Sequence, residues 1–131
     1  MSQSDPLTIL HNSLRGAPII WKGDYPYFIH PISDGIPRME AEVLRATRDL
    51  IVSIVDWSKI DLIVSVEAMG LPLLAAVGEV TGKPTLVIRK RPYGMEGEVK
   101  VDVSTGYSQS TAYINDISPG ERILVVDDVI S

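Results

Sequence analysis

The chain has 131 residues, of which 45% are hydrophobic and 22% are charged, so it can form one domain around a single core and does not resemble a disordered chain. It has no cysteine, which excludes disulfide bonds, thiol catalysis and thiolate metal sites, and its net charge of -5 argues against nucleic-acid binding, which requires a basic surface. No apolar run approaches the roughly 20 residues that cross a bilayer, and no signal peptide is visible at the start. We therefore expect a cytoplasmic protein with no membrane or nucleic-acid partner.

The first part of the chain predicts a helix followed by an irregular aromatic segment. Ser4-Asp5-Pro6 is typical of a helix start, because a capping side chain precedes a proline in the first turn, and Gly16 ends the helix. The segment from residue 19 to residue 37 contains three prolines among several aromatic residues, which predicts a packed flap with short strands. The aromatic side chains can cover a ligand or belong to the core, and both interpretations stay open. We interpret the two histidines of the chain, His11 and His30, as a helix-face residue and a structural residue.

Beyond the flap, apolar periodicity predicts helices and strands in alternation. Residues 39–55 and 71–80 have helical spacing. The runs 61–66, 85–89 and 123–126 are short, apolar and rich in β-branched residues, which predicts strands that are buried on both faces, as in a parallel sheet covered by helices.

This order predicts an α/β fold with a doubly wound, mostly parallel sheet. We expect one domain over residues 1–131, with an N-terminal helix and hood in residues 1–38 and a mobile loop or hairpin in residues 90–115. Alternating valines at positions 99, 101 and 103 favour the hairpin. Ligands of such sheets bind beyond the carboxyl ends of the strands.

Each predicted strand ends in a distinctive cluster. The glycine after the first strand opens a helix, whose free amides can bind phosphate oxygens, although ordinary strand-to-helix turns look the same. Cations follow the second strand, where they can neutralise an anionic leaving group or form a solvated strand end. Two adjacent carboxylates follow the third strand and require a compensating metal, ligand hydroxyls or helix amides. The clusters are Glu67-Ala68-Met69-Gly70, Arg89-Lys90-Arg91 and Asp127-Asp128.

Taken in this order, the clusters resemble those of type I phosphoribosyltransferases. Residues 123–131 are similar to the start of the donor-binding signature of that family, and residues 67–70 resemble its pyrophosphate loop. Residues 83–98 are similar to the second strand and the mobile catalytic loop of the purine enzymes. Residues 27–35 and 105–108 resemble segments of archaeal hypoxanthine/guanine phosphoribosyltransferases. The likeness extends over about residues 17–131.

The resemblance implies an enzyme of purine salvage that transfers ribose 5-phosphate from phosphoribosyl pyrophosphate to a purine and releases pyrophosphate. It implies the donor and the purine (hypoxanthine, guanine or adenine) as partners, Mg²⁺ as cofactor, and a homodimer. Asp127 and Asp128 would bind the ribose hydroxyls and meet Mg²⁺ indirectly, through ribose and pyrophosphate. Arg89 and Lys90 would complete the catalytic set by adding positive charge at the pyrophosphate. The other residues implied in substrate binding are Glu67, Ala68, Met69, Gly70, Arg91, Tyr93, Tyr107 and Ser131.

Two departures from the family bear on this interpretation. The family signature continues past Ser131 with a glycine- and threonine-rich turn that binds the 5-phosphate, so the resemblance implies a C-terminally truncated domain that binds the donor weakly and exposes apolar surface on its third strand. Human-type hypoxanthine-guanine enzymes have an aspartate at the position matching Ser131, and a serine cannot act as that base. The preferred purine therefore stays open.

Two other functions compete with this one. A non-catalytic relative would bind a nucleotide or pyrophosphate without turnover. A receiver or phosphatase-like domain would use Asp127 and Asp128 around a metal, but receiver domains carry their acidic pair after the first strand, whereas this pair follows the third.

Overall fold

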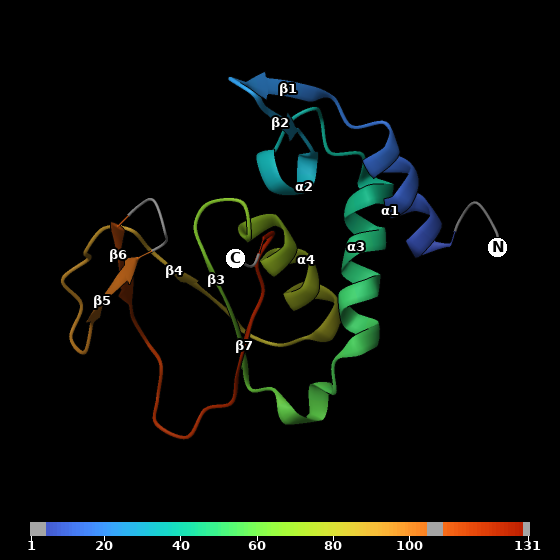
Figure 1. Ribbon diagram of the computed structural model, residues 1–131. Coiled ribbons are helices and arrows are strands. Elements are labelled where there is room, and N and C mark those ends of the chain that lie inside the picture. The colour runs from blue at the N-terminus through green and yellow to red at the C-terminus, as the bar shows by residue number, and fades with distance from the viewer. Residues whose placement is uncertain (1–4, 105–108, 130–131) are drawn as a thin grey trace.

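A three-stranded parallel sheet with helices packed on one face forms the centre of the molecule (Figure 1). The structure is a computed structural model, and it describes residues 5–104 and 109–129. No helix in these two ranges is long and apolar enough to span a membrane. In chain order the elements are α1 (Pro6–Arg15), β1 (Ile19–Lys22), β2 (Tyr25–Phe28), α2 (Pro31–Asp34), α3 (Ala41–Ile54), the 3-10 turn η1 (Trp57–Lys59), β3 (Leu62–Val66), α4 (Leu71–Thr81), β4 (Thr85–Ile88), β5 (Val99–Ser104), β6 (Gln109–Ile114) and β7 (Ile123–Val125).

The strand β3 is the centre of the sheet, which has the order β4-β3-β7 with all strands parallel. Ile63 pairs with Thr85 on one side and with Leu124 on the other. Because the three strands run in the same direction, their carboxyl ends lie at one edge of the sheet. The predicted parallel α/β sheet is confirmed.

The prediction that all three strands are buried on both faces is wrong for two of them. Residues 62–65 of β3 are buried, but Thr85 of β4 is exposed and Val125 of β7 is 60% exposed. Both strands lie at sheet edges in the described part of the chain, and an apolar run by itself does not distinguish an edge strand from a central one. The expectation of exposed apolar surface on the third strand is confirmed.

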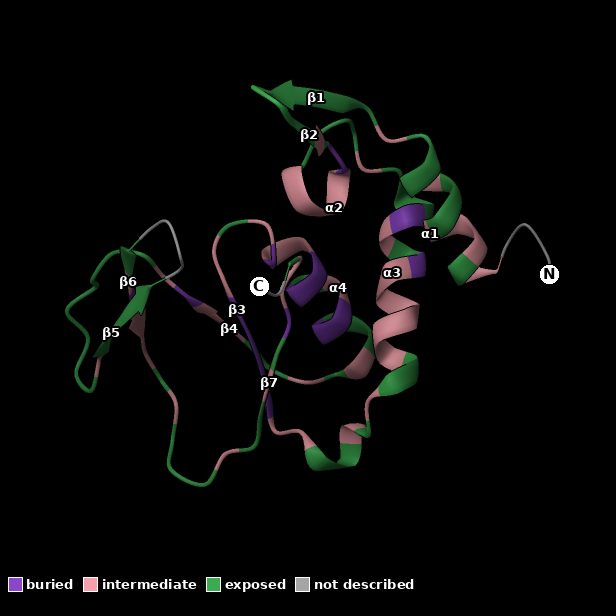
Figure 2. Cartoon of the chain, viewed as in Figure 1, coloured by how far each residue is buried: buried purple, intermediate pink, exposed green. Residues whose placement is uncertain are grey.

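The two faces of the sheet are covered in different ways (Figure 2). On one face α4 packs against β3, with α3 beyond it, and the buried side chains there belong mainly to Ile63, Leu74 and Val77. On the other face Leu62 and Val64 pack against Ala112 of β6, together with partly buried residues near it. Backbone hydrogen bonds in both directions between Arg89 and Tyr113 join the β5–β6 hairpin to the end of β4.

The N-terminal region consists of the helix α1 and of a hairpin with a short helix, which we call the hood. The Asp5 side chain caps α1 by accepting from the Thr8 amide at 3.2 Å, and α1 packs on α3. The hood consists of the antiparallel β1–β2 hairpin and α2, and it lies beyond the carboxyl-end edge of the sheet (Figure 1). Its Trp21 and Phe28 are 66% and 53% exposed, so these aromatic rings do not belong to the core.

The buried His30 has the structural role that the sequence predicts. Its Nδ1 accepts from the Ile32 amide at 3.1 Å and so caps α2, while its Nε2 lies 3.0 Å from the Ser13 hydroxyl of α1. Burial lowers the pKa of the imidazole. One ring nitrogen therefore caps the short helix of the hood, and the other joins the hood to the first helix.

The core can be tested with two valines of the same helix. Val77 is fully buried against the sheet, whereas Val80 is 49% exposed. Val77→Ala leaves a cavity and is expected to lower the free energy of unfolding by about 2 kcal/mol, while Val80→Ala is expected to change it by less than about 0.5 kcal/mol. Urea denaturation of both variants measures the difference, and equal effects would contradict this description of α4.

Candidate functional site

The carboxyl ends of β3 and β4 are tied together by one carboxylate. Glu67, directly after β3, accepts from Arg89 Nε at 2.6 Å and from the Lys90 amide at 3.0 Å. The Lys90 amide, followed by the Arg89 guanidinium, lowers the pKa of Glu67. The Glu67–Ala68 peptide bond, which opens the loop to α4, is cis. This arrangement places the backbone of the loop beside two cationic residues.

The carboxyl ends of β3 and β7 meet at Gly70, the N-cap residue of α4. A Cβ atom at Gly70 would lie 2.0 Å from Ser65 Oγ and 2.9 Å from Asp127 Oδ1, so only glycine fits between these two side chains. Ser65 is fully buried, and its hydroxyl has no hydrogen-bond partner within residues 5–104 and 109–129. The start of the 11-residue helix α4 therefore lies directly beside an aspartate of the third strand end.

The two aspartates differ in their surroundings. The Asp128 amide donates to Asp127 Oδ1 at 2.8 Å, which turns the chain sharply after β7. Partial burial and the neighbouring Asp127 carboxylate raise the pKa of Asp128 to about 6. A nearby cation or hydroxyl donors would stabilise the ionised form of such a carboxylate. Carboxylates with a raised pKa are concentrated at functional sites.

The hood lies close to these aspartates. The Tyr27 hydroxyl donates to Asp34 Oδ1 at 3.2 Å, which is the main cause of its raised pKa, and the charge of Asp128 adds to the shift. The Asp34 carboxylate also accepts from the His30 amide at 3.0 Å, which lowers the pKa of Asp34. Gly35, at the end of α2, packs beside the Met69 side chain. The hood thus contacts the loop after β3.

A cavity of about 290 Å³ opens between the hood, the helices and the end of β7. Phe28, His30 and Ile32 line it from the hood, and α1, α3 and α4 contribute mostly apolar side chains. Asp127, Asp128 and Val129 form its polar end. The cavity has the size and the composition of a small-molecule site, with apolar walls and a few converging polar groups.

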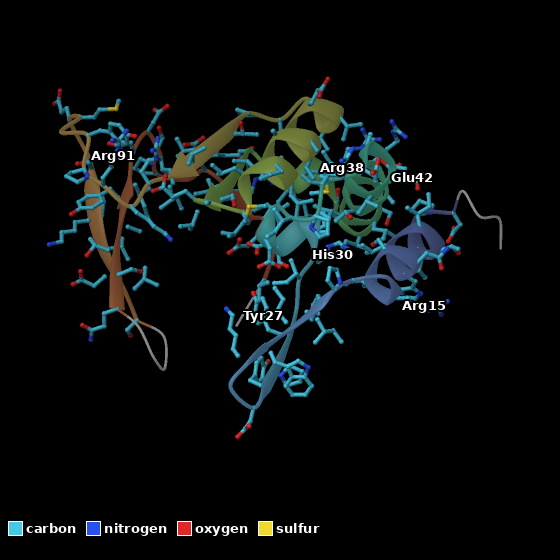
Figure 3. The ribbon with its side chains drawn as sticks, turned by 90° about the horizontal axis from the view of Figure 1, so that it is seen from above. Arg15, Tyr27, His30, Arg38, Glu42 and Arg91 are labelled. Carbon is cyan, nitrogen blue, oxygen red and sulfur yellow. The ribbon has the colours of Figure 1, made fainter. Side chains whose placement is uncertain are left out.

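The second cluster continues into the loop before β5. Arg91 donates through Nε and Nη2 to the Tyr93 hydroxyl, both at 3.1 Å, and this contact raises the pKa of Arg91. The Arg89 guanidinium carbon lies 5.1 Å from the centre of the Tyr93 ring. Figure 3 shows Arg91 by the hairpin at the left of the view, away from Tyr27 and His30, which lie nearer the middle of the molecule.

The structure thus brings together most of the residues singled out from the sequence, but in two groups. The loop of residues 67–70 joins both groups, with the cations and Tyr93 on one side and Asp127 and Asp128 on the other. Arg89, Lys90 and Arg91 do not line the cavity that contains the aspartates. Tyr107 and Ser131 lie outside the described residues.

Two polar side chains at this site carry no assigned role in the sequence interpretation. Ser65 lies inside an apolar strand, where a single serine has no periodic signature, and Asp34 lies in the irregular flap. The only available signal was a polar residue in an otherwise apolar run, and it does not reveal that Ser65 faces Gly70. The path of the backbone through the α2 turn and through the loop after β3 decides both positions.

The fold matches that of type I phosphoribosyltransferases. The adenine phosphoribosyltransferase of Thermoanaerobacter pseudethanolicus aligns with a TM-score of 0.70 at 16% identity, over 88% of this chain and 68% of that one. The enzyme of Saccharomyces cerevisiae aligns with a TM-score of 0.71 at 15% identity, over 91% and 70%. At these identities the likeness establishes the fold of the chain.

Sequence comparison then identifies the family. The hypoxanthine/guanine phosphoribosyltransferase of Aciduliprofundum boonei is 50% identical over 125 residues, which cover 95% of this chain and 68% of the relative. That of Methanohalophilus mahii is also 50% identical over 125 residues and is covered to 65%. The chain belongs to the hypoxanthine/guanine phosphoribosyltransferase family, and it spans about two thirds of the length of these relatives. No family model matches it.

The close packing at Gly70 can be tested with a destabilising variant and a second substitution that partly compensates for it. Gly70→Ala forces Ser65 or Asp127 to move and is expected to lower the free energy of unfolding by about 2 kcal/mol. Ser65→Ala alone is expected to have little effect, because the hydroxyl it removes has no partner in the described structure. The double variant should recover part of the loss, since one of the two clashes is gone. Gly16→Ala is the control, because its Cβ meets only Asn12 O at 3.7 Å; denaturation curves in which Gly70→Ala and Gly16→Ala coincide would contradict the packing.

The raised pKa of Asp128 predicts how stability depends on pH. In the folded protein Asp128 keeps its proton up to about pH 6, whereas the ordinary pKa of an aspartate, which applies to the unfolded chain, is 3.8. The unfolded chain therefore loses this proton first, and the free energy of unfolding falls as pH rises between these two values. Asp128→Asn removes this cost. At about pH 7.5 it is expected to raise the free energy of unfolding by about 1 kcal/mol, which is less than the full shift would give because the side chain is only partly buried. The gain should disappear towards about pH 4, and a gain independent of pH in urea titrations would refute the assignment.

Proposed function

We propose that this chain binds phosphoribosyl pyrophosphate and a purine, and that it transfers ribose 5-phosphate to a purine nitrogen with release of pyrophosphate. The observation that carries the proposal is the meeting of three strand ends at the loop of residues 67–70, with two cationic residues on one side and two aspartates on the other. The names of the relatives support hypoxanthine and guanine as the acceptor bases.

The aspartates are proposed to hold the sugar. A ribose with two free hydroxyls needs acceptors at fixed positions, and Asp127 and Asp128 provide carboxylate oxygens at the end of β7. Asp127 is held between its own chain and Gly70 of α4, and it accepts from the Asp128 amide. The hydroxyl donors of the sugar would also favour the ionised form of Asp128, which burial disfavours in the free protein.

The loop and the cations are proposed to hold the leaving group. As the glycosidic bond breaks, negative charge grows on the pyrophosphate, and positive groups placed in advance stabilise that change. Ala68, Met69 and Gly70 offer backbone groups at the start of α4, where phosphate oxygens are favoured. Arg89 and Lys90 would add charge, and the Glu67 contact holds Arg89 at this end of the sheet.

The donor set fits Mg²⁺ held together with the substrate. No group of three or more His, Cys, Asp or Glu that could hold a metal occurs in the part of the chain that the structure describes. Mg²⁺ commonly binds through one or two carboxylates and substrate phosphates, rather than in a cage made of protein alone. Asp127 and Asp128 would hold it indirectly, through ribose and pyrophosphate, and when bound it would offset charge on the leaving group.

The hood is proposed to cover the base, and residues 90–115 are proposed to close over the donor. Phe28 lines the cavity that ends at Asp127 and Asp128, so a planar base could lie against the aromatic ring while the sugar meets the carboxylates. Closure of the hairpin would exclude water and so prevent hydrolysis of the donor. Tyr107, Arg91 and Tyr93 would then approach the substrate from this segment, and Ser131 would contact it after the aspartates.

A homodimer in the cytoplasm completes the proposal. Exposed apolar side chains on the hood, among them Ile19 and Trp21, support an interface with a second copy. The donor carries several negative charges and does not cross membranes unaided, which supports a cytoplasmic site of action.

The activity can be tested directly. The chain is mixed with phosphoribosyl pyrophosphate, Mg²⁺ and hypoxanthine, guanine or adenine, and product is followed by absorbance. Asp127→Asn and Asp128→Asn are expected to lower kcat/KM about 100-fold, because each removes a carboxylate at the reacting sugar. Glu79→Gln, an exposed change of the same charge near the end of α4, is the control. Absence of turnover together with Mg²⁺-dependent binding of pyrophosphate would instead support a non-catalytic binding protein.

A further inference from the structure

The loop between β4 and β5 is closed around the carboxylate of Glu98. Glu98 Oε2 accepts from the Tyr93 amide at 2.9 Å, and Oε1 accepts from the Gly94 amide at 3.3 Å. Positive φ angles at Gly94 and Gly97, 71° and 83°, allow the chain to curl back on itself. These amides lower the pKa of Glu98, with that of Tyr93 as the largest cause. Two successive amides aimed at one carboxylate form a compact anion-binding turn.

The same carboxylate connects this turn to the base of the hairpin. Asn115 Nδ2 donates to Glu98 Oε2 at 3.0 Å, and the neighbouring residues Val99 and Ile114 are the first pair of the β5–β6 ladder. Residues 91–97 are all exposed, so apolar packing does little to hold the turn in place. Glu98 is partly buried and is the residue through which the turn is fastened to the hairpin.

Tyr93, whose amide binds Glu98, also contacts the cationic cluster. Its ring centre lies 5.1 Å from the guanidinium carbons of both Arg89 and Arg91, and its hydroxyl accepts from Arg91. A guanidinium near an aromatic face gains cation–π energy and loses freedom to rotate. Arg89 in turn donates to Glu67 at the start of the proposed pyrophosphate loop. Glu98, Tyr93, Arg89 and Glu67 therefore form one continuous line of contacts.

We propose that Glu98 is a positioning residue for the pyrophosphate group, which acts by holding Tyr93 so that the Arg89 and Arg91 guanidinium groups stay at the leaving-group end of the site. This inference rests on the proposed function and adds a residue that does not itself touch the substrate. The sign of the effect is diagnostic. Glu98 is an anion near a site for an anion, so loss of its charge alone would strengthen pyrophosphate binding, whereas loss of its positioning role weakens it.

Two glutamates of the same loop provide a matched comparison. Glu98→Gln keeps the size of the side chain, but its amide group must point a donor at another donor, Gly94 N, Tyr93 N or Asn115 Nδ2. Glu96→Gln makes the same change of charge at an exposed position two residues away. The double variant Glu98→Gln/Asn115→Asp restores the net charge and lets the new glutamine donate to the new aspartate while its oxygen accepts from Gly94. The Tyr93 amide, which shares Oε2 with Asn115, still faces a donor, so this variant restores the charge without restoring the hold on Tyr93.

Isothermal titration with pyrophosphate and Mg²⁺ gives the first readout. Glu98→Gln is expected to raise the Kd for pyrophosphate about tenfold, since charge-assisted contacts to the turn are lost. Glu96→Gln should leave the Kd unchanged or lower it slightly, and the double variant should stay weak, because the Tyr93 amide still lacks its acceptor. In turnover assays the KM for the purine should stay constant, because the hood is not involved.

Hydrogen exchange at the Tyr93 and Gly94 amides gives the second readout, independent of any ligand. Both amides should be protected in the wild type and in Glu96→Gln, and should exchange faster in Glu98→Gln. Unchanged pyrophosphate affinity in Glu98→Gln, despite faster exchange, would overturn the positioning role alone. A wild-type chain that binds no pyrophosphate would overturn the proposed function, and the positioning role with it.

Discussion

Parallel pairing of β3 with both β4 and β7 is the constraint on which the site depends. Parallel strands place their carboxyl ends at the same edge, so three segments separated by about 20 and 40 residues of chain end within contact of one another. β3 can hold the centre because both of its faces are buried, by α4 on one side and by β6 on the other. Glu67 and Gly70 then complete the junction, the first by binding the end of β4 and the second by admitting Asp127 at close range.

The junction also shows where function and stability oppose each other. Asp128 has a pKa of about 6 because it is partly buried beside Asp127, so its ionised form destabilises the free protein. In the proposed reaction the hydroxyls of the sugar would donate to the same carboxylate, and the bound substrate would then stabilise its ionised form. Ser65, buried without a partner in the described structure, lies at the same junction, and such strained or unsatisfied groups are commonly found near functional sites.

The cationic residues are held in place by side chains from neighbouring loops. Arg89 is held from two directions, by Glu67 in the loop after β3 and by the ring of Tyr93 in the loop before β5. Tyr93 is in turn placed by Glu98, which belongs to the hairpin rather than to the sheet. A change at Glu98 can therefore reach the Arg89 guanidinium through Tyr93, whose amide binds Glu98 and whose ring lies beside Arg89, without any movement of the central strands.

Much of this arrangement follows from the sequence alone, because it depends on local patterns. The two long helices, the hood with its short strands, the hairpin valines and the glycine and aspartates at strand ends are all set by periodicity, capping and turn residues that act over a few positions. Only the tertiary structure decided that β7 lies at an edge with Val125 exposed, that Ser65 rather than another residue faces Gly70, and that Glu98 binds the turn that carries Tyr93. These outcomes depend on which strands become neighbours in space and on the path of the backbone through each loop, and an amino-acid pattern contains no direct record of either.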